Sequence, residues 1–156
     1  MSDTFYQKLT AIRHHIHQHP EVSEKEYNTT RFIKEQLQNI GIEPLDYPLK
    51  TGVIAEIGHG YPIIALREDI DALPIFEKTG LAYASDNGAM HACGHDFHQT
   101  SLLGAAERLK QQEATLKGTV RLIFQVAEEN FQGGHQVIAA GGIEGVSAIV
   151  GYHNNP

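Results

Sequence analysis

The sequence has one cysteine, no tryptophan and only 12 basic residues against 19 acidic ones. One cysteine excludes an internal disulfide framework and is typical of a protein of the reducing cytoplasm. The net charge of −7 argues against a general affinity for nucleic acid or anionic membranes. No apolar run approaches the roughly 18 residues of a membrane span, and the N-terminal MSDTFYQKLT contains no apolar stretch typical of a secretory signal. We therefore expect a cytoplasmic protein without nucleic-acid or membrane partners.

What the sequence does contain is a large stock of side chains that bind metals or transfer protons. Ten histidines accompany the 19 acidic residues. Hydrophobic residues make up 41% of the 156 residues and charged residues 20%, which is a globular composition and argues against intrinsic disorder. The length fits one domain of about 150 residues, or one part of a larger domain.

Hydrophobic periodicity predicts alternating helices and strands. We expect a first helix over 4–18, with Asp3 as its N-cap, because apolar residues recur there at helical spacing. Residues 23–26 (SEKE) form a capping box, which predicts the start of a second helix that ends at Gly41. The remaining pattern predicts strands over 53–57, 63–66, 120–126 and 148–151, and helices over 97–113 and 135–140. Such alternation predicts an α/β domain with helices packed on a mostly parallel sheet.

Polar side chains follow three of the predicted strands. Asp69 and Asp71 come after the strand over 63–66, Glu128 and Glu129 after the strand over 120–126, and His153 after the last strand. In an α/β sheet, ligands bind in the crevice outside the carboxyl ends of the strands. If these strands are parallel, four carboxylates and an imidazole meet at one edge.

A fourth polar cluster, residues 91–98 (HACGHDFH), is predicted to lie in a loop just before a helix. Gly94 allows a tight turn, so Cys93 and His95 could face one point. Thiolate, imidazole and carboxylate together are ligands for a transition metal, with zinc the first candidate.

Each of these clusters also has an ordinary structural explanation. Paired acids at strand ends can be a solvated rim or helix caps, Cys93 can be a small buried hydrophobe, and His153 can be a surface imidazole. The coincidence of all four clusters at predicted strand and loop ends favours a metal site. The other histidines have explanations without a metal: capping or packing at a helix end for His14, His15, His17 and His19, and surface positions for His59 and His135.

Five segments, in order along the whole chain, carry a further pattern: RHHIHQHPE at 13–21, ALREDIDALPI at 65–75, MHACGHDFH at 90–98, FQVAEE at 124–129 and GYHNNP at 151–156. Together they resemble the motifs of the M20 metallopeptidases, specifically the amidohydrolase branch with hippurate hydrolase, auxin-conjugate hydrolases and N-acyl-amino-acid deacylases. Two positions depart from the family pattern: Glu68 stands where alanine is usual, and Val126 replaces a proline.

The resemblance implies a two-metal hydrolase that cleaves the amide bond of N-acyl amino acids or related small peptides. It also implies a three-layer sandwich of the zinc-exopeptidase kind, with helices on both faces of a mixed, mostly parallel sheet. The implied cofactor is a divalent transition metal, with zinc first and manganese, cobalt or nickel as alternatives. By motif position, the metal ligands are Cys93, His95, Glu129 and His153, the catalytic residues are Glu128 as general base and Asp71, and the supporting acids are Asp69 and Asp96.

Residues 1–156 are expected to be the N-terminal portion of the family's catalytic domain. The family's lid and dimerisation domain, and a C-terminal segment with one more histidine ligand, are expected to be absent from it. Two other interpretations stay open: an inactive, truncated metal-binding remnant, and a thiol enzyme with Cys93 as nucleophile and His95 as base. An apolar sheet edge left open predicts a homo-oligomer.

Overall fold

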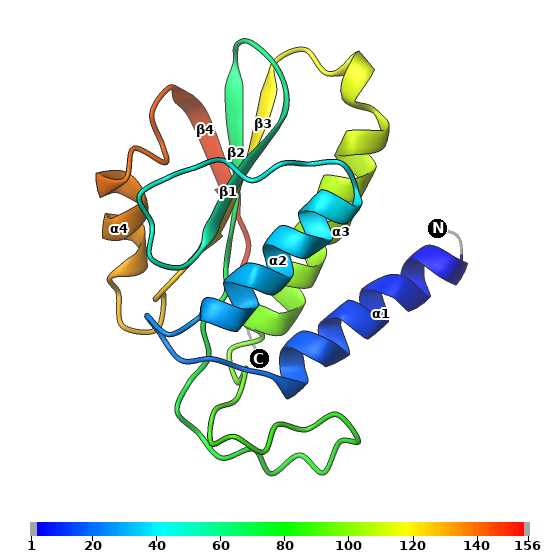
Figure 1. Cartoon of the computed structure of the whole chain (residues 1–156), viewed down its shortest axis with the longest axis vertical. Coiled ribbons are helices and arrows are strands. Elements are labelled where there is room, and N and C mark those ends of the chain that lie inside the picture. Colours follow the sequence, from blue (N-terminus) through cyan, green and yellow to red (C-terminus); the bar gives the residue numbers. More distant parts are fainter. Residues whose placement is uncertain (1–2, 155–156) are drawn as a thin grey trace.

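The computed structural model describes residues 3–154 and contains a four-stranded sheet with the order β1-β3-β2-β4 (Figure 1). Strand β1 (Val53–Gly58) runs antiparallel to β3 (Thr119–Gln125). Strand β2 (Ile63–Asp69) pairs in parallel with both β3 and β4 (Val146–Gly151). The predicted α/β fold with a mixed, mostly parallel sheet is confirmed.

Helices cover both faces of this sheet. Helices α2 (Tyr27–Asn39) and α3 (His95–Gln111) lie on one face, and the short α4 (Gly133–Ala139) lies on the other (Figure 1). Helix α1 (Asp3–Gln18) packs on the outside of α3, and a single 3₁₀ turn, η1 (Glu113–Thr115), links α3 to β3. The arrangement is the three-layer sandwich that the sequence predicted.

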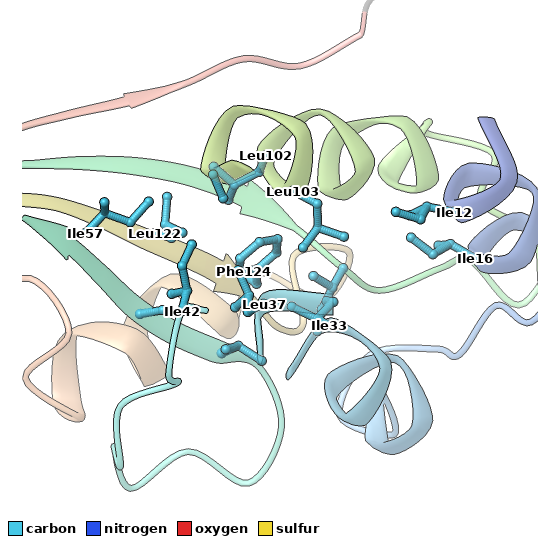
Figure 2. Close-up of a cluster of buried hydrophobic side chains, with 14 residues drawn as sticks. Ile12, Ile16, Ile33, Leu37, Ile42, Ile57, Leu102, Leu103, Leu122 and Phe124 are labelled. Carbon is cyan, nitrogen blue, oxygen red and sulfur yellow. The ribbon is translucent and has the colours of Figure 1, made fainter. Parts of the chain in front are cut away.

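The larger hydrophobic core lies between the sheet and α1 to α3 (Figure 2). Burial of each Ile, Leu or Phe side chain stabilises the fold by about 1.5–3 kcal/mol. A smaller core seals α4 to the opposite face through Ile54, Ala65, Ile123 and Val137. The central residues of the larger core are Ile12, Ile16, Ile33, Leu37, Ile57, Leu102, Leu103, Leu122 and Phe124.

Several element boundaries differ from the prediction. Asp3 lies inside the first turn of α1 rather than at an N-cap, and its charge there still interacts favourably with the helix dipole. Strand β2 continues to Asp69 instead of ending at Leu66, because Glu68 and Asp69 are buried and its three charged last residues still pair with β3. Helix α3 begins at His95 rather than near residue 97, since Gly94 adopts a left-handed conformation (φ 83°) at the N-cap.

The predicted capping box at 23–26 is wrong. Helix α2 begins only at Tyr27, and the Glu26 side chain makes no capping bond. Glu26 is fully buried and accepts hydrogen bonds from the Ala127 N–H and the Thr51 hydroxyl, both at 2.9 Å. Ser23 instead donates its hydroxyl to Asp71 at 2.6 Å. Ser23 and Glu26, which the local pattern assigned to the start of the second helix, therefore make long-range contacts instead.

Strand β4 is an edge strand within residues 3–154, since it pairs only with β2 there. Its apolar side chains Ile149 and Val150 are 54% and 57% exposed. The opposite edge is β1, whose side chains are mostly buried. None of the helices in the described part of the chain is long and apolar enough to cross a membrane.

Candidate metal centre

The carboxyl ends of β2, β3 and β4 meet at one edge of the sheet, because these strands are parallel. Asp69 is the last residue of β2, Glu128 and Glu129 follow β3 in a turn, and His153 follows β4. The first turn of α3 brings His95 to the same edge. The structure thus places the predicted acids and imidazoles together.

His95 is the centre of this group. Its Nδ1 lies 2.8 Å from the backbone oxygen of Asp71, which can only accept, so Nδ1 carries the proton. Its Nε2 is buried, finds no hydrogen-bond partner among residues 3–154, and lies 3.5 Å from Asp69 Oδ1 and 3.8 Å from carboxylate oxygens of Glu128 and Glu129. Metal-ligating histidines commonly donate one ring N–H to a carbonyl and use the other nitrogen for the ion.

Cys93 adds a sulfur donor to the same point. The ligand atoms of Cys93, His95 and Glu129 all lie within 4.8 Å of one another. Burial, together with the nearby carboxylates of Glu129 and Glu128, raises the pKa of the Cys93 thiol to about 12. A divalent cation at this point would favour the thiolate and offset the carboxylate charges, so the donor set fits a transition metal. A protonated thiol does not suit the thiol-enzyme interpretation.

His98, which sequence analysis left without a role, supports the segment after β4. Its Nδ1 lies 2.6 Å from Asp69 Oδ1, and its Nε2 accepts the Asn154 N–H at 3.1 Å. His153 donates Nδ1–H to the Asn154 oxygen at 2.6 Å, and its ring centroid lies 5.7 Å from that of His95. Both nitrogens of His98 are thus engaged, while Nε2 of His153 is left for a ligand. The signal for His98 was its spacing of three from His95 on one helix.

The last two residues of the GYHNNP segment, Asn155 and Pro156, lie outside the described residues.

The turn that carries the two glutamates is held by buried acids. Asp71 Oδ2 accepts the Glu129 N–H at 3.0 Å. Burial raises the pKa of Asp71, but hydrogen bonds from His95, Ser23 and this N–H outweigh it and leave the pKa below its ordinary value. Glu26 accepts the N–H of Ala127, the residue before the pair. This role of Glu26 is not visible in the sequence, because its partner lies 101 residues away.

The two glutamates differ in exposure rather than in distance from His95. The Glu128 side chain is 30% exposed and that of Glu129 15%, although each has an oxygen 3.8 Å from His95 Nε2. Glu129 is the one grouped with Cys93 and His95. Glu128 is therefore the carboxylate more open to water.

Asp96 faces α1 rather than the proposed ligands. Its Oδ2 lies 3.0 Å from Arg13 Nε and 3.0 Å from His17 Nδ1, and His17 Nε2 lies 3.0 Å from Glu77 Oε1. Asp96 was expected to support the metal ligands. It instead links α3 to α1, and through His17 to the loop around Glu77. The spacing of four between Arg13 and His17 places both on one face of α1, which accounts for the first family-like segment. The His14 ring stacks on that of Tyr83 with ring centroids 3.7 Å apart, which is the packing role expected for this histidine.

An α/β sheet whose carboxyl edge gathers thiol, imidazole and carboxylate donors is the architecture of a metal-dependent hydrolase domain. The chain belongs to peptidase family M20/M25/M40, because the sequence model of that family matches residues 65–156. The resemblance seen in the sequence is confirmed.

Characterised relatives and a solved structure agree. The chain is 53% identical over 156 residues to the N-acetyl-L-cysteine deacetylase of Bacillus subtilis, covering 98% of this chain and 38% of that protein. It is 44% identical over 149 residues to the N-acyl-L-amino acid amidohydrolase of Geobacillus stearothermophilus, covering 93% of this chain and 40% of that protein. The crystal structure of the Bacillus subtilis YXEP protein, a dinuclear metal-binding peptidase of the M20 family, superposes with a TM-score of 0.97 at 53% identity, over 99% of this chain and 45% of that one. The chain thus spans about two-fifths of the length of these curated relatives.

Proposed function

We propose that this chain is the metal-binding portion of an amidohydrolase that cleaves the amide bond of N-acyl amino acids or related small peptides. The observation that carries the proposal is the buried Nε2 of His95, which has no hydrogen-bond partner among residues 3–154 and faces three carboxylates. The names of two relatives, a deacetylase of N-acetyl-L-cysteine and an amidohydrolase of N-acyl-L-amino acids, support the substrate class. The single free cysteine suits action in the reducing cytoplasm.

In this proposal Cys93, His95, Glu129 and His153 hold divalent transition metal, with zinc, manganese, cobalt and nickel all compatible with the donor types. When bound, the metal would supply Lewis-acid chemistry, which lowers the pKa of a water and polarises an amide carbonyl. Asp71 fixes the His95 ring through its backbone oxygen and fixes Glu129 through its carboxylate. These bonds orient both ligands before an ion arrives.

Glu128 is the proposed general base. Its carboxylate is partly exposed beside the proposed ligands and can take a proton from a water on that side. The same carboxyl group can then give the proton to the leaving nitrogen of the amide. Glu129 is less exposed and lies with Cys93, which suits a ligand.

Residues 1–156 form the N-terminal portion of the catalytic domain in this proposal, and the lid and the C-terminal catalytic segment belong to the rest of the family architecture. An alternative is a chain that binds metal without turnover. It is favoured by the exposed positions of His153 and of the β4 side chains, which leave one side of the site open.

Metal content and turnover test the proposal together. We expect the purified chain, never exposed to chelator, to carry a transition metal measurable by elemental mass spectrometry. Cys93→Ser combined with His95→Ala should lose this metal, while the surface variant His59→Ala should keep it. Metal with turnover of N-acetyl amino acids supports the amidohydrolase, and metal without turnover supports the alternative. Equal metal in the wild type and the double variant contradicts both.

A further inference from the structure

A surface cavity of about 670 Å³ lies between the end of α1, the beginning of α2 and the loop at residues 86 and 87. His15, His19 and Glu35 all line it. None of these residues belongs to the metal centre described above. The cavity therefore holds a separate set of side chains that could bind a ligand.

The two imidazoles are held in place within the structure. His15 and His19 are four residues apart, on the same side of the α1 end, and their ring centroids are 4.5 Å apart. The His15 ring also stacks on Phe32 of α2 at 4.3 Å. The Nδ1 atom of His19 lies 2.7 Å from the backbone oxygen of His15. Because that oxygen can only accept, Nδ1 carries the proton, and Nε2 is left as an acceptor. This is the same tautomer-fixing contact that His95 makes at the metal centre.

A carboxylate is available from the facing helix. Glu35 of α2 lines the same cavity as His15 and His19. Among residues 3–154 the Glu35 carboxylate has one ion pair, a long one of 3.9 Å to Arg31 Nε, and the two side chains are 58% and 70% exposed. An exposed pair of this length holds its side chains weakly, so Glu35 is free to turn toward the imidazoles.

We propose that His15 and His19, with Glu35 as a third ligand, form a second site for a first-row divalent metal ion, which bridges α1 and α2. Imidazole suits zinc, copper and nickel, and two histidines with one carboxylate leave coordination positions open to water in the cavity. An ion held by both helices binds the folded chain better than the unfolded chain, so it should raise stability as its concentration rises.

The test is calorimetric titration of the purified chain with Ni²⁺. We expect the His15→Ala/His19→Ala variant to bind one Ni²⁺ fewer per chain than the wild type and to lose the Ni²⁺-dependent rise in melting temperature. The matched control, His59→Ala/His135→Ala, removes two exposed imidazoles elsewhere and should bind like the wild type. Glu35→Gln should keep the ion with weaker affinity. Equal stoichiometry in the wild type and His15→Ala/His19→Ala overturns the proposal, as does an equal loss in the control.

A measurement on the unaltered chain removes any dependence on how the variants fold. Ni²⁺ is paramagnetic, so we expect it to broaden amide NMR signals around residues 15–19 and 31–35. Broadening confined to the surroundings of Cys93 and His95 overturns the proposal. Cys93→Ser should leave the signals at 15–19 responsive to Ni²⁺, so failure of this site and failure of the proposed function are distinguishable.

Discussion

Ala127 adopts a left-handed backbone conformation (φ 50°) immediately before Glu128 and Glu129. Such a conformation costs a non-glycine residue on the order of 1–3 kcal/mol and persists only where the surroundings impose it. Here the Ala127 N–H is bound by the buried Glu26, and the Glu129 N–H by the buried Asp71. Two acids from distant parts of the chain therefore set the position of the proposed base and ligand.

Glu128 and Glu129 should respond differently to loss of charge. In a protein with the full family architecture, we expect Glu128→Gln to keep its metal and to lose turnover by about 10²–10⁴-fold, the usual contribution of a general acid–base group. Glu129→Gln should lose metal affinity as well, because an amide is a poorer ligand than a carboxylate. Steady-state kinetics and metal analysis of the two variants check this. Near-normal kcat in Glu128→Gln would mean that another residue is the base.

Glu68 predicts a pH-dependent stability. Burial, reinforced by the charge of Asp69, raises the pKa of Glu68 from 4.5 to about 7. The unfolded chain therefore releases this proton at lower pH than the folded chain does, and this contribution to stability falls as pH rises from about 4.5 to about 7. We expect Glu68→Gln, which stays neutral, to be more stable than the wild type by about 2–3 kcal/mol at pH 8 and nearly equal to it at pH 4.5. Urea unfolding of metal-free protein at the two pH values measures this, and a pH-independent difference would contradict it.

The sequence indicates where the proposed ligands lie along the chain, but not which residues hold them in place. Glu129 and His153 follow apolar stretches that hydropathy predicts as strands, so their positions after strands could be predicted. Glu26 has the right spacing for a helix cap, and only tertiary contacts show that it is buried against Ala127. The role of His98 likewise depends on Asn154, a neighbour far along the chain.

At the scale of elements, α1 is joined to α3 by ion pairs of two kinds, one buried and one exposed. Asp96 is 1% exposed and binds Arg13 and His17 of α1. Lys8 of α1 binds Glu107 of α3 at 2.7 Å, with side chains 41% and 20% exposed. A buried acid with two partners should contribute more than an exposed pair, which typically contributes up to about 1 kcal/mol.

We therefore expect Asp96→Ala to destabilise the chain by about 2–3 kcal/mol, because it leaves Arg13 and His17 without their acceptor. Lys8→Ala, the matched control on the same helix pair, should cost less than about 1 kcal/mol. Urea unfolding gives both values, and hydrogen exchange should show faster exchange in α1 of Asp96→Ala than in α2. Equal costs for the two variants would contradict the tether.

Strand β4 offers the second prediction at this scale. An open edge with exposed apolar side chains favours pairing with another chain, so we expect the 156-residue chain to form dimers or larger species. Ile149→Lys should shift the chain toward monomer, because charged edge residues oppose strand pairing. Ile138→Lys, which alters an equally exposed isoleucine on α4, should leave the association unchanged. Analytical ultracentrifugation measures this, and a monomeric wild type would refute it.

Element boundaries show what the pattern of apolar residues misses. The prediction ended β2 at Leu66, because Arg67, Glu68 and Asp69 look like solvent-exposed loop residues. In the fold they are paired with β3, and Arg67 binds both Asp69 and Gln125 at 3.0 Å. The charged end of β2 is thus held in the sheet by pairing with β3 and by hydrogen bonds among its own side chains and Gln125. Hydropathy alone does not indicate such partners.

At the scale of the whole molecule, the two helical layers cover opposite faces of the sheet with cores of different size. Helices α2 and α3 and the large core fix one face of the sheet, while the short α4 covers the other through a small core. Gly133 allows α4 to begin close to β3, since a Cβ there would lie 1.6 Å from the Val126 oxygen. This close approach keeps the glutamate turn short, and so holds the two glutamates at the edge of the sheet.

The open side of the site predicts how the isolated chain behaves as a catalyst. Glu128 is 30% exposed and Tyr152, next to His153, is 41% exposed, so water has free access and a substrate would be held from one side only. Loss of positioning alone can remove several kcal/mol of barrier lowering. We expect the monodisperse 156-residue chain to hydrolyse N-acetyl and N-benzoyl amino acids, with added zinc or manganese, with a kcat below about 1 s⁻¹, the low end for ordinary enzymes. The full-length Bacillus subtilis deacetylase, of which this chain matches 38%, is the control under the same conditions. A kcat of about 1 s⁻¹ or larger for the 156-residue chain would contradict this prediction. It would show that the edge of this sheet positions the substrate without contacts from another side.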